Sequence, residues 1–397
     1  MRSGGTSGPS RPPTTMIFSI TVTGILTNTL IGPGIPDILD AFDRSDSAAG
    51  LFVAAGTFAG IFMAPVIGVL ADRFGRRAVL IPCLVVFGVG GLLAGAAPSF
   101  WALIGFRFVQ GVGGAGLINL AVVIISDHYD GLERARMIGR NAAVLTISLA
   151  VFPAVGGLLT ELGGWRLPFA LYAVALVTAV AAYRWLPPVD LGERQPLGHQ
   201  LRAAGEVLRR PIVALAIAWG FVVFTLVFGV FLTALPIHLD DEFGLGPGPR
   251  GLVIAAPAAS ATVVALSVGR LRAAIGGRMI ILVSTGLWAV AFTLIGLAPL
   301  LPLVLLAALL YGLGEGGSFP TLQDHVAGSA PAASRGAVVA VFVGAARAGQ
   351  TVGPLLAAVG LALVGASGTF LVAGALTAAA FAVQALVRPS RVASPAR

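Results

Sequence analysis

Lysine is absent from this sequence of 397 residues, and all 25 basic residues are arginines. A phosphate-binding loop that ends in lysine therefore cannot form, which excludes an ATP-driven pump of that type. Cysteine occurs once, at Cys83 in an apolar run, so the chain forms neither an intrachain disulfide nor a cysteine metal cluster. Histidine is also scarce, and no set of residues has the spacing of a metal site or of a nucleophile with its base. We predict no metal, no cofactor and no enzyme activity.

Charged residues are equally scarce, at 11% of the chain against 57% hydrophobic residues, with a mean hydropathy of +0.95. This balance is far from that of a soluble domain. The net charge of +8 raises the question of nucleic-acid binding. The arginines, however, are spread over short segments rather than gathered in one patch, so we expect the lipid bilayer and no nucleic acid as partner.

Apolar stretches of about 20 residues, each long enough to cross the hydrocarbon core of a bilayer, recur along the chain. A polar segment at 188–211 separates the first six from the last six, and no cleaved signal peptide is expected. The expected spans are 16–38, 49–70, 79–97, 101–126, 138–160, 166–187, 212–236, 250–271, 278–297, 301–326, 336–363 and 366–388. The expected units are a disordered tail (1–15), a six-helix bundle (16–187), a linker (188–211), a second bundle (212–388) and a tail (389–397).

The sequence repeats itself at an offset of 201 residues. The pattern at 68–77 recurs at 269–278, the glycines of 111–116 recur at 312–317, and Pro153 corresponds to Pro354. Two repeated halves with a site between them are the architecture of secondary transporters. We predict an all-α membrane protein of twelve transmembrane helices in two pseudo-symmetric six-helix bundles, working as a monomer on a small molecule and protons.

The arginines predict the orientation of the chain. If the N-terminus is cytoplasmic, 20 of them fall on the inner side and only Arg44, Arg166 and Arg250 on the outer side. This asymmetry predicts cytoplasmic N- and C-termini, and we expect a bacterial inner membrane. Acidic residues gather on the outer side after the first and seventh spans, namely Asp37, Asp40, Asp43, Asp46, Asp240, Asp241 and Glu242.

At 68–77, between the second and third spans, the chain resembles the major facilitator superfamily, and the family's loop motif is complete. The resemblance covers the whole chain and implies that Asp72 is a latch, which closes the cytoplasmic side in the outward-open state. The second copy has Ala273 in its place, and a purely topological role for Arg76 and Arg77 is the alternative. The latch residues are Gly68, Asp72, Arg73, Gly75, Arg76 and Arg77.

Two further motifs also resemble this family. Arg107, Gln110, Gly111 and Gly113 match the motif of the fourth span. The fifth span resembles the motif of the twelve-span drug:proton antiporters, although Ser148 and Phe152 stand where glycine is usual. Each proline of the repeat frees a carbonyl and bends its helix, which predicts a hinge, although both residue types are simply common in membrane helices. The hinge residues are Pro153, Gly156, Gly157, Gly349, Gly353 and Pro354.

Three ionisable residues lie deep within spans: Arg107, Glu315 and Arg347. Each costs about 3 kcal/mol at a helix centre on insertion scales, so each should face a wet cavity or another charge. Glu315 and Arg347 both lie about 16 Å from the cytoplasmic ends of their helices, which predicts that they pair. We interpret Glu315 as the proton carrier, with Arg347 and Arg107 as coupling partners. The alternatives are a static Glu315–Arg347 pair and direct binding of a cationic substrate group.

The remaining polar and aromatic side chains within spans predict a substrate pocket. An apolar, aromatic wall with scattered amides suits amphipathic organic molecules. Two acid–histidine pairs, Asp127–His128 and Asp324–His325, are interpreted as solvated helix ends. We predict export of such compounds by proton antiport, with uptake symport or facilitation, or a non-transporting membrane sensor, as alternatives. The expected pocket residues are Asn28, Gln110, Asn119, Trp219, Phe224, Phe228, Tyr311 and Gln350.

Overall fold

The structure is a computed structural model that describes residues 11–187, 211–328 and 335–386. Within these ranges every regular element is a helix, as the sequence predicts. The expected linker and C-terminal tail lie almost entirely outside the described residues, and so does most of the expected N-terminal tail. That tail is shorter than expected, because the first helix already begins at Thr14.

The first bundle contains the helices that precede the linker. They are α1 (Thr14–Thr29), η1 (Gly32–Gly34), α2 (Ile35–Ala41), α3 (Ala48–Phe74), α4 (Arg76–Gly95), α5 (Phe100–Gly114), α6 (Leu117–His128), α7 (Gly131–Gly163), η2 (Leu167–Tyr172) and α8 (Ala173–Trp185). The second bundle follows the linker. Its helices are α10 (Pro211–Thr225), the π-helix η3 (Leu226–Ala234), α11 (Leu235–Phe243), α12 (Pro247–Leu297), α13 (Leu301–Gly328) and α14 (Arg335–Leu386).

Two pairs of expected spans follow each other without a loop between them. The bounds of α12 and of α14 each include two helices, which meet at Gly276 and at Gly365, where φ is 78° and 71°. Only glycine adopts this left-handed conformation readily, so the chain reverses there on one residue instead of a loop. Ten helices in the described residues are long and apolar enough to cross a membrane. Because α12 and α14 each supply two crossings, this number is compatible with twelve spans.

Three of the expected spans contain a local irregularity, although each is long and apolar enough to cross a membrane as one stretch. The first span breaks after α1, where Gly32 and Pro33 form the 3-10 turn η1, and the fourth breaks between α5 and α6. Proline removes a backbone donor and glycine favours other conformations, which explains a break at these residues. The seventh span passes through η3, where Thr233 Oγ1 donates to the Phe228 carbonyl at 2.6 Å.

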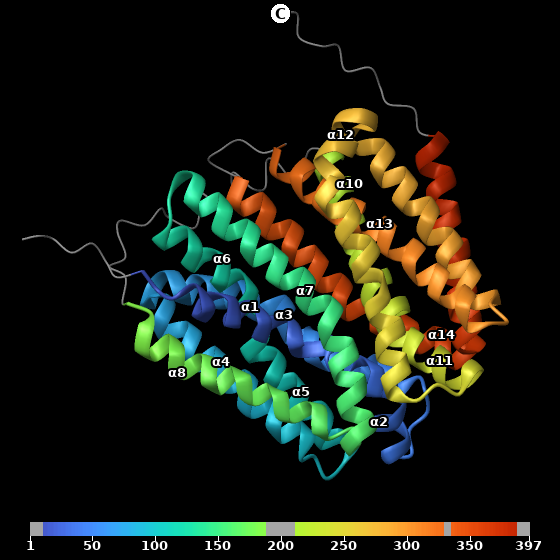
Figure 1. Ribbon diagram of the computed structural model, residues 1–397, viewed down its shortest axis with the longest axis horizontal. Helices are drawn as coiled ribbons and strands as arrows, with labels where there is room; N and C mark the ends of the chain where they lie inside the picture. The colour runs from blue at the N-terminus through green and yellow to red at the C-terminus, as the bar shows by residue number, and fades with distance from the viewer. Residues whose placement is uncertain (1–10, 188–210, 329–334, 387–397) are drawn as a thin grey trace, which may run out of the picture.

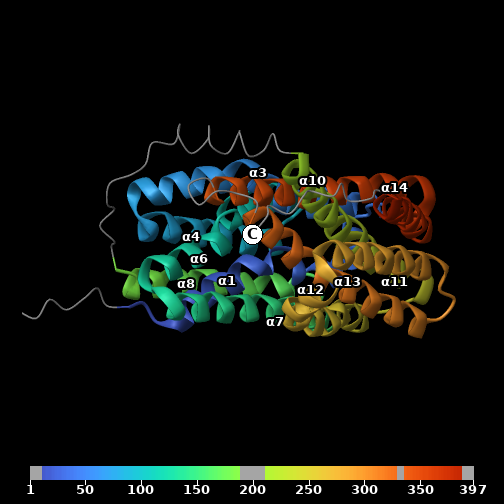
Figure 2. The same cartoon turned by 90° about the horizontal axis from the view of Figure 1, so that it is seen from above.

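The two bundles lie side by side, the first coloured blue to green and the second yellow to red (Figure 1). They meet along two seams. One is formed by α3 and α14 and the other by α7 and α12, on opposite edges of the view in Figure 2. Within the bundles helices also approach closely, and a Cβ on Gly316 would lie 2.3 Å from the Ala261 carbonyl oxygen. Apolar side chains such as Leu266, 83% exposed, cover the outside, as expected in lipid.

Candidate functional site

Arg107 occupies the centre of the first bundle and is fully buried. Its Nη1 donates to the Thr27 carbonyl at 2.7 Å and to Gln110 Oε1 at 2.6 Å, and its Nη2 donates to Asn28 Oδ1. The guanidinium carbon lies 5.2 Å from the centroid of the Phe52 ring. Neutral oxygens and an aromatic face therefore stabilise this cation in place of a carboxylate.

The break after α1 explains why these acceptors are available. Helix α1 ends at Thr29, so the carbonyls of its last turn have no partner within the helix and carry partial negative charge. Tyr172 adds a second donor to the same turn, since its hydroxyl donates to the Thr27 carbonyl at 3.2 Å. Gly56 leaves room for the guanidinium, because a Cβ there would lie 2.5 Å from Arg107 Nη2.

Two residues expected in the substrate pocket belong to this buried network instead. Asn28 is 6% exposed and Gln110 is fully buried, and both hydrogen-bond with Arg107. Their amides are therefore engaged in stabilising the arginine, and the expectation that they line an open pocket is wrong for this conformation. Within the described residues Arg107 has no carboxylate in ion-pair contact, so its expected coupling to Glu315 is not direct.

Glu315 on α13 and Arg347 on α14 are both half-buried. No ion pair joins them in the part of the chain that the structure describes, so the pairing predicted from their equal depth is wrong for this conformation. Equal depth is a statement about distance along two helix axes. Pairing also requires that the two side chains point toward each other, which depends on the rotation of each helix about its axis.

The aromatic residues expected in the pocket divide into two clusters. The Phe224 ring lies 6.2 Å from Phe228 and 5.2 Å from Phe319, and all three side chains are half-buried. Tyr311, in contrast, is 1% exposed and stacks on Phe231 at 4.3 Å. The first cluster fits the predicted apolar wall, whereas Tyr311 is a packing residue.

The three remaining expected pocket residues differ in exposure and contacts. Asn119 is exposed and Trp219 is half-buried, with its Nε1 unpaired. Gln350 contacts the first bundle through its backbone, since Thr57 Oγ1 donates to its carbonyl at 3.3 Å. The eight expected pocket residues therefore differ in burial, and a common pocket that includes all of them stays a prediction.

Contacts between the bundles concentrate at the end of the molecule that is remote from the linker, which we call the far end. On the seam between α7 and α12, a Cβ on Gly157 would lie 2.2 Å from the Pro247 carbonyl oxygen, and one on Gly251 would lie 2.3 Å from that of Pro153. On the seam between α3 and α14, a Cβ on Gly50 would lie 2.2 Å from the Pro354 carbonyl oxygen. The far end is therefore closed.

Several of the predicted hinge glycines allow close packing of helices, a role that the sequence did not indicate. Gly157 allows the two bundles to touch, and within single bundles Gly156 and Gly353 lie against other backbones. A Cβ on Gly156 would lie 1.6 Å from the Leu30 carbonyl oxygen, and one on Gly353 would lie 2.4 Å from that of Thr225. Close packing accounts for these glycines, and hinge motion at the prolines stays a prediction.

A partly buried ion pair connects the bundles at the same end. Arg250, in the first turn of α12 and 2% exposed, donates from Nη2 to Asp37 Oδ2 at 2.9 Å. Asp240 Oδ1 lies 3.8 Å from the same nitrogen. From the sequence, Arg250 was expected only as a charge on the outer side. The acidic residues that follow the first and seventh expected spans, which include Asp37 and Asp240, were the signal that could have identified its partners.

At the linker end, Arg76 connects three helices of the first bundle. Its Nη1 donates to Asp72, which is i−4 from it, and its Nε donates to Asp127 Oδ2 at 2.9 Å. Asp127, at the end of its helix, is therefore paired with Arg76 of the predicted latch, and the latch function of this network stays a prediction. In this conformation the network joins α3, α4 and α6 within one bundle.

The second bundle also has an ion pair near the end of the segment that corresponds to the latch. There an arginine, rather than an aspartate, lies at the end of the helix. Arg272 of α12 pairs with Asp324 of α13, and both side chains are largely exposed, at 46% and 60%. In the sequence, the visible difference is that Ala273 replaces the latch carboxylate. The structure shows that an arginine beside that alanine contacts an acid on another helix, so Asp324 is exposed but paired.

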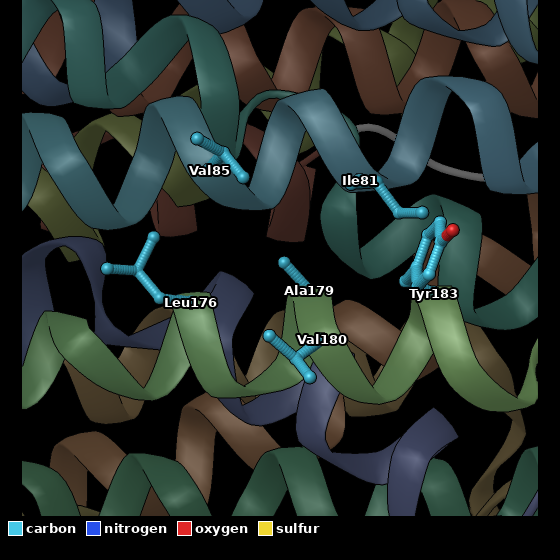
Figure 3. Close-up of a pocket in the computed structure, with 6 residues that line it drawn as sticks. All are labelled: Ile81, Val85, Leu176, Ala179, Val180 and Tyr183. Carbon is cyan, nitrogen blue, oxygen red and sulfur yellow. The ribbon is translucent and has the colours of Figure 1, made fainter.

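A groove of about 380 Å³ lies between α4 and α8 (Figure 3), and its lining includes Val85, Leu176 and Tyr183. The lining is apolar and comes from two helices of the first bundle only. A pathway that is alternately open to two sides needs contributions from both bundles, so this groove is not the candidate site.

The model of the Major Facilitator Superfamily matches residues 17–233 and 217–397. Multidrug resistance protein 2 of Bacillus subtilis (strain 168) is 26% identical over 241 residues, which are 59% of this chain and 60% of that protein. Multidrug transporter protein MdtP of the same organism is 28% identical over 158 residues, 38% of this chain and 29% of MdtP. The class C tetracycline resistance protein of Escherichia coli is 35% identical over 149 residues, 36% of this chain and 37% of that protein.

Each match spans less than two thirds of the relative's length. Among solved structures, the human organic anion transporter MFSD10 (TETRAN) has a TM-score of 0.70 at 19% identity, covering 95% of this chain and 100% of that chain. A D-xylose-proton symporter has a TM-score of 0.77 at 17% identity, covering 93% and 96%. Identities this low show a shared fold.

Proposed function

We propose that this chain, which belongs to the Major Facilitator Superfamily of membrane transporters, exports small amphipathic organic compounds by proton antiport and alternating access. Its membership and its multi-pass helices make it a membrane transporter rather than an enzyme. Curated relatives that are named as multidrug and tetracycline resistance proteins support the direction of transport. The chain works as a monomer in this proposal.

The linker end faces the cytoplasm of a bacterial inner membrane in this proposal, because the arginines concentrate there. The closed far end then faces outward, and the structure corresponds to an outward-closed conformation. Reporter fusions at Arg397 and within 188–211 test the orientation. Both should report a cytoplasmic location, and an external signal from either one contradicts it.

The environment of Glu315 is the observation that most directly supports proton coupling. It is an acid at membrane depth, half-buried, and without an ion-pair partner among the described residues. The charge of an unpaired carboxyl group depends strongly on its access to water. Alternating exposure therefore changes its proton affinity, so that it binds a proton from one side and releases it to the other. The missing ion pair with Arg347 supports this role over a static structural one.

The remainder of the cycle uses contacts at both ends of the bundles. The Asp37–Arg250 pair and the glycine contacts hold the far end closed. When the bundles rotate to open the far end, the Asp72 network closes the linker end, and Pro153 and Pro354 accommodate the bending. The cluster of Phe224, Phe228 and Phe319 provides the apolar surface for the substrate.

The test is transport by Glu315→Gln in inverted membrane vesicles with a panel of dyes and antibiotics. Uphill transport driven by a pH gradient should be abolished, whereas binding or downhill exchange of the same compound should remain measurable. Arg272→Gln, which alters an exposed pair at the linker end, is the matched control and should retain uphill transport. Undiminished uphill transport by Glu315→Gln contradicts the proposed coupling.

Uptake symport is the second candidate, favoured by the departures from the exporter motif at Ser148 and Phe152. The same vesicles separate the two directions. An exporter accumulates substrate when the vesicle interior is acidic, whereas a symporter in inverted vesicles loses preloaded substrate together with protons. Accumulation of substrate in vesicles with an acidic interior, without loss of preloaded substrate, supports export.

A further inference from the structure

We infer that Arg347 binds the anionic group of the transported compound, so that the substrates are amphipathic organic anions with a carboxylate on an aromatic or other apolar body. This inference rests on the proposed function, because it names the class of substrate for the same central pathway. It also gives Arg347 a role that does not depend on the missing ion pair with Glu315.

Arg347 lies where the two bundles meet. It belongs to α14 of the second bundle, and a Cβ added to Gly60, on α3 of the first bundle, would lie 3.7 Å from its Cδ and 3.8 Å from its Nη1. One turn toward the far end, Thr351 Oγ1 and Thr57 Oγ1 lie 3.1 Å apart and connect the same two helices. A residue in this seam is positioned to contact a substrate held between the repeats of a transporter.

The guanidinium of Arg347 has no partner among the described residues: it takes part in none of the ion pairs or hydrogen bonds there. The other buried arginines differ, since Arg107 has backbone and amide acceptors and Arg250 has Asp37. A guanidinium offers five N–H donors, and leaving them unpaired at membrane depth is costly. The side chain is only half-buried, so an anion can reach it.

A carboxylate is the ligand that matches this donor set. Its two oxygens accept two parallel N–H···O bonds from a guanidinium, and the opposite charges add to the affinity. A cationic compound would meet repulsion from Arg347. An anionic compound also leaves Glu315 available to the proton, because the two bind to different charged groups.

The neighbouring helices provide an apolar surface for the body of such a compound. Helix α10 packs directly on α14 beside Arg347, since a Cβ on Gly349 would lie 2.4 Å from the Phe221 carbonyl oxygen. The half-buried rings of Phe224, Phe228 and Phe319 lie on α10, η3 and α13. An aromatic carboxylate therefore combines both features that these helices offer.

The experiment measures equilibrium binding of two matched probes, 2-naphthoate and the neutral 2-naphthamide, to the purified full chain in detergent at neutral pH. The wild-type protein should bind naphthoate at least about tenfold more tightly than the amide, as expected for a charge-assisted hydrogen-bonded pair. Arg347→Gln should lose this preference. Arg347→Lys, which keeps the charge but not the paired donors, should retain a reduced preference.

A charge reversal makes the test more specific. Arg347→Glu should transfer the preference to the cationic probe 2-naphthylmethylamine, a result that loss of folding cannot imitate. Arg272→Gln removes an exposed arginine outside the seam and should bind all three probes as the wild-type protein does. If Arg347→Gln and Arg347→Glu do not fold, the graded effect of Arg347→Lys decides.

Three results would overturn the inference: equal affinity of the wild-type protein for naphthoate and naphthamide, binding of neither probe, or an unchanged preference in Arg347→Gln. Binding is measured without a proton gradient. Failure of proton coupling in the Glu315→Gln experiment therefore leaves this result intact, and failure of anion selection leaves the proposed coupling intact.

Discussion

Arg250 and Asp37 are 213 residues apart in the sequence, yet the Nη2 of one donates to the Oδ2 of the other at 2.9 Å. Each belongs to a different bundle, and the arginine is 2% exposed. Because a buried charge is strongly destabilised when its partner is removed, this contact favours the conformation in which the far end is closed. Of the contacts described above, this ion pair is the one in which side-chain charges of the two bundles stabilise the closed far end.

Arg250→Gln should increase the population of molecules with an open far end by about tenfold or more, since losing a hydrogen bond to a charged group costs about 1.5–3 kcal/mol. The distance between spin labels at Asp43→Cys and Gly246→Cys, in a Cys83→Ser background, measures the opening. The control is Arg44→Gln, which removes an arginine that stacks on Phe100 within the first bundle. An unchanged distance distribution in Arg250→Gln would contradict a gating role.

The far end should close more fully in acid. Burial, and then the carboxylates of Asp40 and Asp240, raise the pKa of Asp46 above its ordinary value of 3.8. Asp240 belongs to the other bundle, so part of this shift exists only when the far end is closed. The raised pKa means that ionised Asp46 disfavours the closed state, and this penalty is relieved as the pH falls through the raised pKa toward 3.8.

Spin labels at Arg44→Cys and Gly246→Cys, in the same Cys83→Ser background, measure this dependence between neutral pH and about pH 4.5. The first label is moved from Asp43 so that Asp43 can be varied. The closed population should grow on acidification, and Asp46→Asn should be more closed at neutral pH with a weaker dependence. Asp43→Asn removes a carboxylate of the same α2–α3 connection that is not among the causes of the raised Asp46 pKa and should behave as the wild-type protein. A larger open population in acid would refute the assignment.

Asp72→Asn should impair transport much more than stability. The Asp72 side chain is 64% exposed in its pair with Arg76, and exposed pairs contribute about 0–1 kcal/mol. Protein abundance should therefore be normal, whereas transport should be lost, because the latch acts in only one state of the cycle. Asp324→Asn, in the exposed pair of the second bundle, is the control and should retain transport. Full transport activity of Asp72→Asn would contradict the latch role and would mean that Asp72 contributes only to the orientation of the chain in the membrane.

Glu315 and Arg347 should behave independently in stability measurements. Neither has an ion-pair partner among the described residues, so Glu315→Gln should not strand the arginine. The effects of Glu315→Gln and Arg347→Gln on thermal unfolding should add to within about 0.5 kcal/mol. A coupling energy clearly above this would show that the static pair exists, and recovery of proton-driven transport in the double variant would exclude Glu315 as the carrier.

The expected interaction between these two residues shows where sequence reasoning stops. The rise per residue predicts how deep a side chain lies along its helix, and on that basis the two residues matched. The rotation and tilt of each helix decide which neighbour a side chain faces, and these depend on packing against all other helices. Asn28 and Gln110 illustrate the same limit, because their depth suited a pocket but the packing gives both to Arg107.

An all-helical membrane transporter of two repeated halves could be predicted from the sequence alone, because hydropathy, the 201-residue repeat and the loop at 68–77 are patterns that can be read along the chain. The sequence also indicated Arg107, Glu315 and Arg347 as the charges at membrane depth. The packing of the helices was needed to show which groups stabilise Arg107, that Arg347 between the bundles has no ion-pair partner among the described residues, and that Arg250 joins Asp37. These contacts connect residues far apart in the chain, so they depend on how the helices pack rather than on any periodic signal.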